Sequence, residues 1–428
     1  MALRLLSTLV DPPEAIEGAL APISPVPPAE LAVATRAIVE SVRTRGDAAI
    51  REFVREFDGV ELDVLAVSPA EVNAARARIA PTALAAIEAA AAHIAAFYGA
   101  QPRGDWFSER DDARFGYIER PLDRVGIHVP AGKAPLPSTL LMAAVPARAA
   151  GVPEVIVCSA PRRDGSVDPH LLAAARVAGV DRYFRVGGAQ AVAALAFGTE
   201  SIPRVDKIFG AGNPYVVMAK RLVFGHVDIH SLPGPSEIVV IADQSATARW
   251  VAADLISQAE HGQDSLAILL TPSLPLARAV MDEVARQLSG LPRAEVARAC
   301  LEKRGWAIVT RDLDEACALA NRCAPEHVEL LVADPRAWLP RIRNAGAVFL
   351  GGYSSEPMGD YVAGPSHILP TGGTARFSSP LHVSSFLKRI SVIEYGESAF
   401  RRDASHAQTL ARAEGLEAHA RAIEVRLE

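Results

Sequence analysis

Residues 154–198, EVIVCSAPRRDGSVDPHLLAAARVAGVDRYFRVGGAQAVAALAFG, contain the pattern that decides the fold. Two short apolar runs, EVIVCSAP and RYFRVGG, alternate with two helical segments, PHLLAAARVAG and AQAVAALAFG. Short β-rich runs that alternate with helices are typical of βαβ units, which place their strands in one parallel sheet. The stretch therefore predicts a doubly wound α/β domain.

The same alternation continues on both sides of this stretch. RVGIHVP and KIFGAGN add two strands, so a first α/β domain is expected over 102–235. A second series begins with SEIVVIAD and continues with LAILLTPS, GWAIVTRD, VELLVAD and AGAVFLGG, over 236–376. We predict an α/β fold of two tandem Rossmann-like, doubly wound domains with parallel sheets.

The two ends of the chain have the apolar periodicity of helices. We expect residues 1–101 to form a helical N-terminal region that packs largely on the second α/β domain. The tail, 377–428, ends in AQTLARAEGLEAHARAIEVRLE and is too short for a domain of its own. We expect it to be helical and to pack elsewhere, for example on a partner subunit.

Composition limits the class of partner. Half of the 428 residues are hydrophobic, and the formal net charge of -6 gives no electrostatic reason to bind nucleic acid or an anionic membrane. The apolar run from Ala83 to Ala96 is interrupted by Glu88 and His93, so no membrane span is expected. Four scattered cysteines without a CxxC pair argue against a thiolate zinc site and fit a reducing cytoplasm.

Two glycine turns follow strands of the first expected domain. VGGAQ contains Gly187 and Gly188, and FGAGNPY contains Gly210 and Gly212. Each precedes a helix, whose N-terminus suits an anion, although the third glycine of the dinucleotide fingerprint is absent. Tight-turn geometry alone explains either one, but two turns at the carboxyl edge of one sheet favour a nucleotide bound in an atypical way.

The stretch SQAEHGQD ends an otherwise apolar-striped helix with polar side chains. Gln258 and His261 are three residues apart, so both leave the same face near the helix end. A carbonyl oxygen and an imidazole nitrogen aimed at one point make half of a zinc site. The alternative is a solvated helix end in which His261 interacts with the helix dipole.

Pro325 in RCAPEHVELL stops the preceding helix and places Glu326 and His327 at a strand entrance. Neighbouring residues of an extended chain point in opposite directions, so these two could act as separate bases on two sides of a substrate. A solvated turn is the alternative.

Two further stretches contain candidate ligands. PMGDYVAGPSHILPTGG holds Asp360, a candidate oxygen ligand, and His367, a candidate substrate contact or ligand. EGLEAHARA places Glu414 and His419 on a C-terminal helix, where a histidine is more often a surface residue.

Taken together, the motifs resemble those of the histidinol dehydrogenase family from about Glu119 to the end of the chain. The motifs that carry the resemblance are PSTLLMAAVPARAAGV, VGGAQAVAALAFGTESIPRVDKIFGAGN, GPSEIVVIAD, DLISQAEHGQDS, APEHVEL, GDYVAGPSHILPT and EGLEAH.

The resemblance implies a zinc-dependent, NAD-linked enzyme that oxidises L-histidinol to L-histidine through the aldehyde, the final steps of histidine biosynthesis. It implies an intertwined homodimer in which the C-terminal tail completes the partner's active site. In this family Glu326 and His327 match the catalytic pair. The zinc ligands would be Gln258, His261, Asp360 and His419. Substrate contacts would come from these ligands and His327 together with Ser236, His367 and Glu414, and NAD contacts from His128, Gln190 and Asn213.

The resemblance also implies a division of labour. His327 would take the alcohol proton while a hydride leaves for the nicotinamide, and Glu326 would activate the water that attacks the aldehyde. Zinc would anchor the substrate, and the zinc ion itself would not change redox state.

Some positions differ from the usual family pattern, namely His128, Ala131, His230, Ser231 and Ser366. Two alternatives follow. The chain could be a paralogue for another primary alcohol, such as a sulfonated diol whose anionic group Lys133 would hold. It could also be a non-catalytic descendant that binds zinc or a ligand, against which the intact Glu326 and His327 count.

Overall fold

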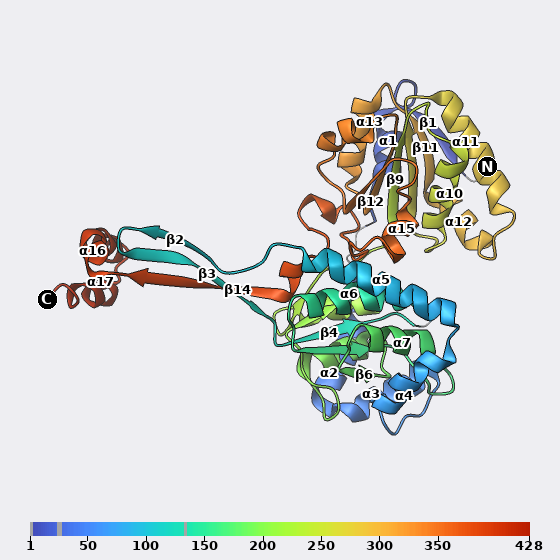
Figure 1. The fold of residues 1–428 in the computed structure, drawn as a ribbon. Coiled ribbons are helices and arrows are strands. Elements are labelled where there is room, and N and C mark those ends of the chain that lie inside the picture. Colours follow the sequence, from blue (N-terminus) through green and yellow to red (C-terminus); the bar gives the residue numbers. More distant parts are fainter. Residues whose placement is uncertain (1–2, 24–27, 132–134) are drawn as a thin grey trace.

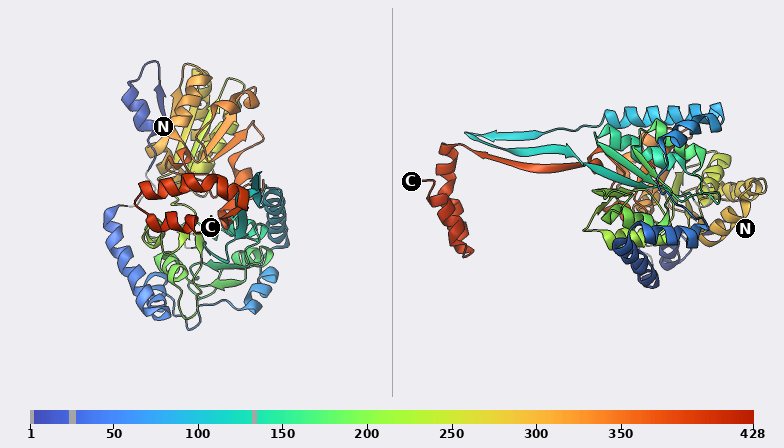
Figure 2. Two further views of the ribbon diagram at one scale, coloured as in Figure 1. Left: turned by 90° about the vertical axis from the view of Figure 1, so that its left-hand side faces the viewer. Right: turned by 90° about the horizontal axis from the view of Figure 1, so that it is seen from below.

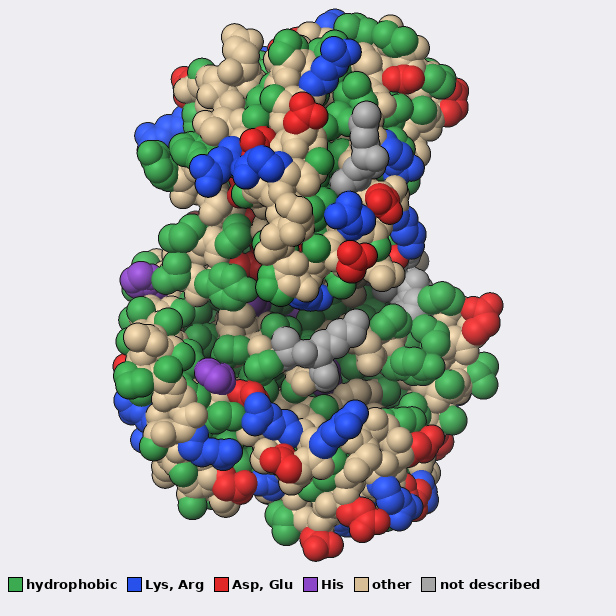
Figure 3. Space-filling view, turned by 90° about the vertical axis from the view of Figure 1, so that its right-hand side faces the viewer, with side chains coloured by type: hydrophobic (Ala, Val, Ile, Leu, Met, Phe, Trp, Pro, Cys, Tyr) green, Lys and Arg blue, Asp and Glu red, His purple; other side chains and the backbone are tan. Residues whose placement is uncertain are grey.

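The computed structural model describes residues 3–23, 28–131 and 135–428. Two α/β domains lie one above the other, and a long arm leaves the lower domain and ends in a helical hairpin (Figure 1). The view from below shows that the arm stands clear of both domains (Figure 2, right). On the face away from the arm a furrow separates the two domains (Figure 3).

The first domain is built on a five-stranded parallel sheet with the order β6-β5-β4-β7-β8. Its helices enclose two apolar clusters, one on each face of the sheet, as expected for a doubly wound fold. The strands are β4 (Arg124–His128), β5 (Glu154–Cys158), β6 (Arg182–Phe184), β7 (Lys207–Phe209) and β8 (Asp228–Ile229), and the helices are α6 (Pro137–Ala149), α7 (Pro169–Val177), α8 (Gly188–Phe197) and α9 (Pro214–Val223).

The second domain has a six-stranded parallel sheet with the order β1-β11-β10-β9-β12-β13. Every residue of its central strands β9 and β10 is buried, because helices cover both faces. The strands are β1 (Arg4–Ser7), β9 (Glu237–Ala242), β10 (Leu266–Thr271), β11 (Gly305–Val309), β12 (His327–Leu331) and β13 (Ala347–Leu350). The helices are α1 (Pro13–Leu20), α10 (Ala248–Ala259), α11 (Leu274–Leu288), α12 (Ala294–Arg304), α13 (Leu313–Cys323), α14 (Pro335–Trp338) and α15 (Glu356–Tyr361). The predicted fold class is therefore confirmed.

The expected packing of the N-terminal region was wrong. Only β1 and α1 join the second domain, where β1 pairs with β11 and α1 contacts α13. The next helices, α2 (Ala29–Arg45), α3 (Asp47–Phe53), α4 (Pro69–Ala74) and α5 (Pro81–Gly99), pack on the first domain. Helical periodicity gives each helix an apolar face but does not say which surface that face will cover.

The arm is a three-stranded antiparallel sheet with the order β14-β3-β2. Strands β2 (Trp106–Arg110) and β3 (Ala113–Pro121) come from the segment assigned to the first domain, and β14 (Leu387–Tyr395) comes from the tail that was expected to be helical. The hairpin at its tip is formed by α16 (Glu397–Ala413) and α17 (Glu417–Glu424). Strand pairing across some 270 residues joins these segments, which local sequence cannot reveal.

Helix α5 is, by length and composition, apolar enough to cross a membrane, and it alone passes that test among the described helices. One of its faces is buried in the first domain through Ile87, Ile94 and Tyr98, and alanines dominate the other. This is the pattern of an amphipathic helix on a protein surface.

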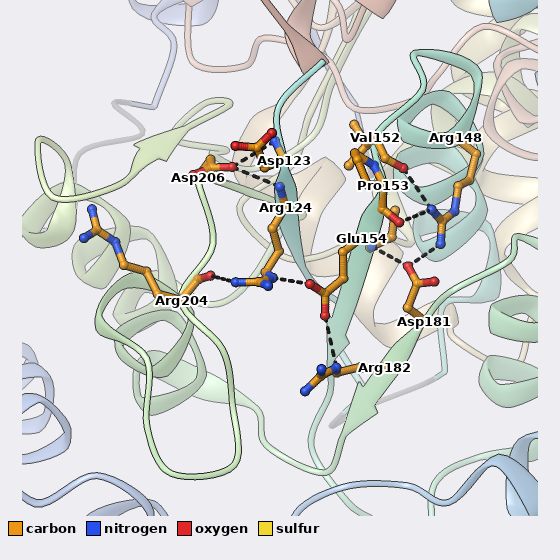
Figure 4. A network of polar contacts seen from close by, with 11 residues as sticks. Asp123, Arg124, Arg148, Val152, Pro153, Glu154, Asp181, Arg182, Arg204 and Asp206 are labelled. Atoms are coloured by element: carbon orange, nitrogen blue, oxygen red, sulfur yellow. Dashed lines mark hydrogen bonds and ion pairs between the residues drawn. The ribbon is translucent and has the colours of Figure 1, made fainter. Parts of the chain in front are cut away.

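Ion pairs join the amino ends of the first sheet. Glu154, where β5 begins, pairs with Arg124 of β4 and with Arg182 of β6 (Figure 4). Asp206 accepts the backbone N–H of Arg124 at 2.9 Å. Charges therefore tie this edge together, while the opposite edge presents the glycine turns.

Candidate active site

The candidate catalytic residues lie at the amino edge of the second sheet. Gln258 is in the last turn of α10 and His261 follows the helix end, while β9 and β12 begin at Glu237 and His327. The segment after α15 packs on α5, where His93 Nδ1 lies 2.8 Å from the carbonyl oxygen of Val362. The cluster therefore faces the boundary between the two domains.

His327 is buried, and two polar contacts at Nδ1 fix the orientation of its ring. Its Nδ1 lies 3.0 Å from the backbone oxygen of Glu237 and 3.0 Å from Oε1 of Gln258. A backbone carbonyl can only accept, so Nδ1 carries the proton and Nε2 keeps its lone pair. Burial lowers the pKa of His327 to about 4, so the imidazole is neutral near pH 7 and can accept a proton.

Glu326 is a second buried base candidate. Its Oε2 accepts the backbone N–H of Glu237 at 3.1 Å and lies 3.8 Å from Nδ1 of His327, too far for a hydrogen bond. Burial raises the pKa of Glu326 well above its usual value. The two side chains are thus independent groups on neighbouring positions.

A cluster of possible metal ligands lies next to this pair. One ligand atom each of His261, Glu356 and Asp360 lies within 4.8 Å of the others. His261 Nε2 is 3.9 Å from Oδ2 of Asp360, and His367 Nδ1 donates to the backbone oxygen of Asp360 at 2.9 Å. These four side chains converge from the end of α10, from α15 and from the segment that follows it.

The polar atoms left over in the cluster fit a divalent cation. Gln258 Nε2 and Glu356 Oε1 are buried without a hydrogen-bond partner. Burial and the nearby Asp360 carboxylate raise the pKa of Glu356 to about 9, the mark of acidic groups gathered without a positive charge. Gln258 presents its Oε1 to Nδ1 of His327, so its oxygen reaches a cation only if the amide rotates; His327 then loses that contact and keeps its hydrogen bond to the backbone oxygen of Glu237. Oxygen and nitrogen donors of this kind suit zinc with an open position.

Sequence analysis missed Glu356. The stretch that was singled out began one residue later, although Glu356 and Asp360 are four apart and share one face of α15. The helical spacing of two carboxylates was the available signal.

The remaining expected substrate residues are divided between two places. Ser236 directly precedes β9, beside Glu237. Glu414 and His419 lie in the helical hairpin at the tip of the arm, and one chain does not bring them to the cluster (Figure 1). Lys133, the expected anion contact, lies outside the described residues.

The three expected cofactor residues gather around the two glycine turns of the first domain. His128 ends β4, and its Nδ1 donates to the backbone oxygen of Ala211 at 2.7 Å, while its Nε2 accepts the N–H of Gly188 at 3.1 Å. One buried imidazole therefore joins both turns. Burial lowers its pKa to about 4, which keeps Nε2 free to accept.

Gln190 and Asn213 occupy the first turns of the helices that follow. The Gln190 carboxamide fills the space beside Gly188, where a Cβ would meet its Oε1 at 2.6 Å. Asn213 caps α9 through Oδ1, which accepts the N–H groups of Tyr215 and Val216. The carboxyl edge of the first sheet thus presents a compact set of turns and helix N-termini.

Comparisons with known proteins agree with this arrangement. Residues 27–427 match the family model described as histidinol dehydrogenase. A histidinol dehydrogenase of Moorella thermoacetica is 54% identical over 93% of this chain and 95% of its own length. One from Pseudomonas aeruginosa is 50% identical over 91% of this chain and 89% of its own. The crystal structure of histidinol dehydrogenase from Elizabethkingia anophelis superposes with a TM-score of 0.95 at 34% identity, and covers 100% of this chain and 98% of that one.

Proposed function

Because this chain belongs to the histidinol dehydrogenase family of NAD-dependent oxidoreductases, we propose that it oxidises L-histidinol to L-histidine through the aldehyde, with zinc as its resident metal. The reaction removes four electrons and uses two molecules of NAD in turn. The four cysteines of the chain are all buried and unpaired, which suits a cytoplasmic enzyme.

One observation carries the proposal. A neutral, oriented imidazole, a separate carboxyl group and a cluster of metal-ligand side chains occur together at one edge of the second domain. Alcohol oxidation needs a base for the hydroxyl proton, and aldehyde oxidation needs a base for water. The cluster supplies both groups beside a place where substrate can be anchored.

His327 acts in the first oxidation. Its Nε2 accepts the hydroxyl proton while the carbon-bound hydrogen leaves as hydride to the nicotinamide. The hydrogen bond from Nδ1 to the backbone oxygen of Glu237 holds the ring in the tautomer that this step requires. Nε2 lies 4.0 Å from Oε1 of Glu356, so the carboxyl group of Glu356 would face the imidazolium once it forms, and that positive charge would favour the ionised form of Glu356.

Glu326 acts in the second oxidation. Its carboxylate takes a proton from the water that adds to the aldehyde, and the resulting hydrate then gives its hydride to a second NAD. Because burial raises its pKa, the group is a stronger base once ionised than a solvated glutamate. The backbone N–H of Glu237 keeps the carboxylate in place.

Zinc would be held by Gln258, His261 and Asp360, together with His419 of a neighbouring chain. When bound, it would anchor the substrate and polarise its reacting group as a Lewis acid. Glu356 lies close enough to contribute a ligand or to hold a ligand in position.

We also propose that two chains exchange their C-terminal tails. The arm does not bury its own apolar surface. Ile393 is 72% exposed and Leu410 is 65% exposed, and only three residues of α16 and α17, all alanines, are buried. Exposed apolar side chains of this extent mark a surface that another protein covers. A partner chain that receives the arm would also receive Glu414 and His419.

The test is the oxidation of histidinol by the purified protein, followed by NADH absorbance at saturating NAD with zinc present. Two NADH for each histidinol are expected, with histidine as the product. No NADH from histidinol, but turnover of another primary alcohol, would overturn the substrate assignment.

Mixed dimers test the shared site. A chain with Gln258→Ala and a chain with His419→Ala are each expected to be inactive alone, and a mixture to regain activity at one site of each heterodimer. Mixtures that stay inactive although heterodimers form would contradict tail exchange.

A further inference from the structure

The connection that carries His367 is held by the first domain. It runs from the end of α15 to the start of β14, over 362–386, and helix α5 lies along the boundary between the domains (Figure 1). Three polar side chains of α5 and the residues that follow it contact backbone groups of this connection. The side chains are those of His93, Tyr98 and Gln101, and the backbone groups belong to Val362, Ser366, Leu381 and Val383.

The hydroxyl of Tyr98 joins two distant points of the connection. Tyr98 is fully buried, donates to the backbone oxygen of Leu381 at 2.7 Å and accepts the backbone N–H of Ser366 at 3.2 Å. Burial raises the pKa of Tyr98 to about 12, so the hydroxyl keeps its proton and can donate and accept at once. Both backbone groups are thereby satisfied in a place that water does not reach.

The backbone is fixed on both sides of His367. Ser366, which precedes it, is held by Tyr98 and donates from its own hydroxyl to the backbone oxygen of Met142 in α6 at 3.1 Å. The same hydroxyl accepts the backbone N–H of Ile368, which follows His367, at 3.1 Å. Ser366 is also one of the positions at which this chain differs from the usual family pattern, so these contacts are a feature of this chain.

His367 itself points back to the metal-ligand cluster of the second domain. Its Nδ1 donates to the backbone oxygen of Asp360 at 2.9 Å and lies 3.8 Å from Oδ1 of the same residue. The side chain therefore stands beside a candidate metal ligand, while the backbone that carries it is fastened to α5 and α6. A displacement of that backbone would move the imidazole relative to the cluster.

We propose that Tyr98 is a positioning residue for the oxidation of histidinol. Its hydroxyl, supplied by the first domain, holds the backbone from which His367 contacts the substrate in the second domain. The proposal rests on the proposed function, in which His367 is a substrate contact. Groups that bind substrate act in catalysis only when their supporting contacts keep them in the productive position. A tyrosine that served the stability of the fold alone would have no effect on substrate binding.

Tyr98→Phe removes the hydroxyl and keeps the ring in the core. We expect KM for histidinol to rise about fivefold to tenfold, roughly the factor that one lost hydrogen bond produces. The zinc content and KM for NAD should stay as in the wild type. Tyr183→Phe is the matched control, because it removes another buried hydroxyl of the first domain, which lies 2.7 Å from Oγ of Ser159. It should lower the thermal midpoint without raising KM for histidinol.

A double-mutant cycle tests whether Tyr98 acts through His367. His367→Ala alone should raise KM for histidinol, and the addition of Tyr98→Phe should then change it by less than about twofold, because the contact that Tyr98 supports is already gone. Two effects that multiply would overturn the proposal, since Tyr98 would then influence the substrate by another route.

Hydrogen exchange tests the Tyr98 contacts without any substrate. In Tyr98→Phe the amide hydrogens of the 362–383 segment should exchange at least about tenfold faster than in the wild type, and in Tyr183→Phe they should not. Unchanged exchange in Tyr98→Phe would overturn the proposal, as would faster exchange with an unchanged KM for histidinol. A wild type that does not oxidise histidinol would instead overturn the proposed function, and the exchange measurement decides separately whether Tyr98 holds the segment.

Discussion

His128→Phe is expected to impair NAD binding more than it impairs the chemical step. Phenylalanine has a similar shape but can neither donate to Ala211 nor accept from Gly188. The two glycine turns would then lose the buried imidazole that joins them. The geometry of the candidate metal ligands and of His327 would remain, because these lie in the other domain.

The magnitude follows from the two lost hydrogen bonds. Each contributes roughly 1 kcal/mol net, and a polar group left buried without a partner costs about 1 kcal/mol or more. We therefore expect a loss of about 2–4 kcal/mol in the free energy of unfolding. If the loosened turns weaken the binding free energy of NAD by roughly 1.4 kcal/mol, the dissociation constant for NAD rises about tenfold.

His128 makes the free energy of unfolding depend on pH, and the sign of that dependence follows from its pKa. Burial lowers the pKa of His128 from 6.5 to about 4, so between these values the unfolded state binds the proton first. Stability contributed by the neutral imidazole is complete above pH 6.5 and is lost as the pH falls toward 4. At about 1.36 kcal/mol per unit this amounts to roughly 3 kcal/mol. The thermal midpoint of His128→Phe should fall less steeply than that of the wild type over this range.

The assay compares KM for NAD with KM for histidinol in steady-state kinetics and measures NAD binding directly by calorimetry. His128→Gln, which keeps a donor and an acceptor, is the matched control and should recover part of the affinity. The reasoning would be refuted by a Phe variant that binds NAD as the wild type does, or by a rise in KM for histidinol alone.

Three further variants probe the remaining groups. His261→Asn should lose zinc and turnover, because one ligand of the cluster is removed; a metal content equal to that of the wild type, measured by mass spectrometry, would contradict the ligand assignment. Glu326→Gln should still release the first NADH and then stall at the aldehyde, so rapid-mixing kinetics that show no first hydride transfer would argue against separate roles for the two bases. Lys220→Met, which removes a fully buried ammonium group of α9, should raise the thermal midpoint near pH 7, since burial lowers the pKa of that group from 10.5 to about 7 and the wild type is penalised by several kcal/mol below that range. Wild-type stability should therefore increase from pH 7 to pH 10.5, and an identical increase in the variant would show that Lys220 is not its source.

The parallel sheets were predictable from sequence because their strands carry a local signal. The β9 segment EIVVIA and the β10 segment LAILLT are continuous apolar runs, and such runs are required when helices cover both faces of a sheet. The motifs around His261, Glu326 and Asp360 were equally visible, since each combines unusual polar residues with a helix end or a proline. The match to a family followed from these local features.

Tertiary structure alone decided which distant segments meet. The arm pairs β3 with β14 residue by residue, although the sequence suggested only helices after Phe377. The hydrogen bonds of His128 to Gly188 and Ala211 could not be inferred, because they join residues far apart in the chain. The same is true of the uncompensated charge of Lys220, because burial of a charge depends on every element packed around it. Local pattern fixes which elements form and which face of each is apolar, whereas the partners of those faces, and the pKa values that burial sets, arise only when the whole chain has folded.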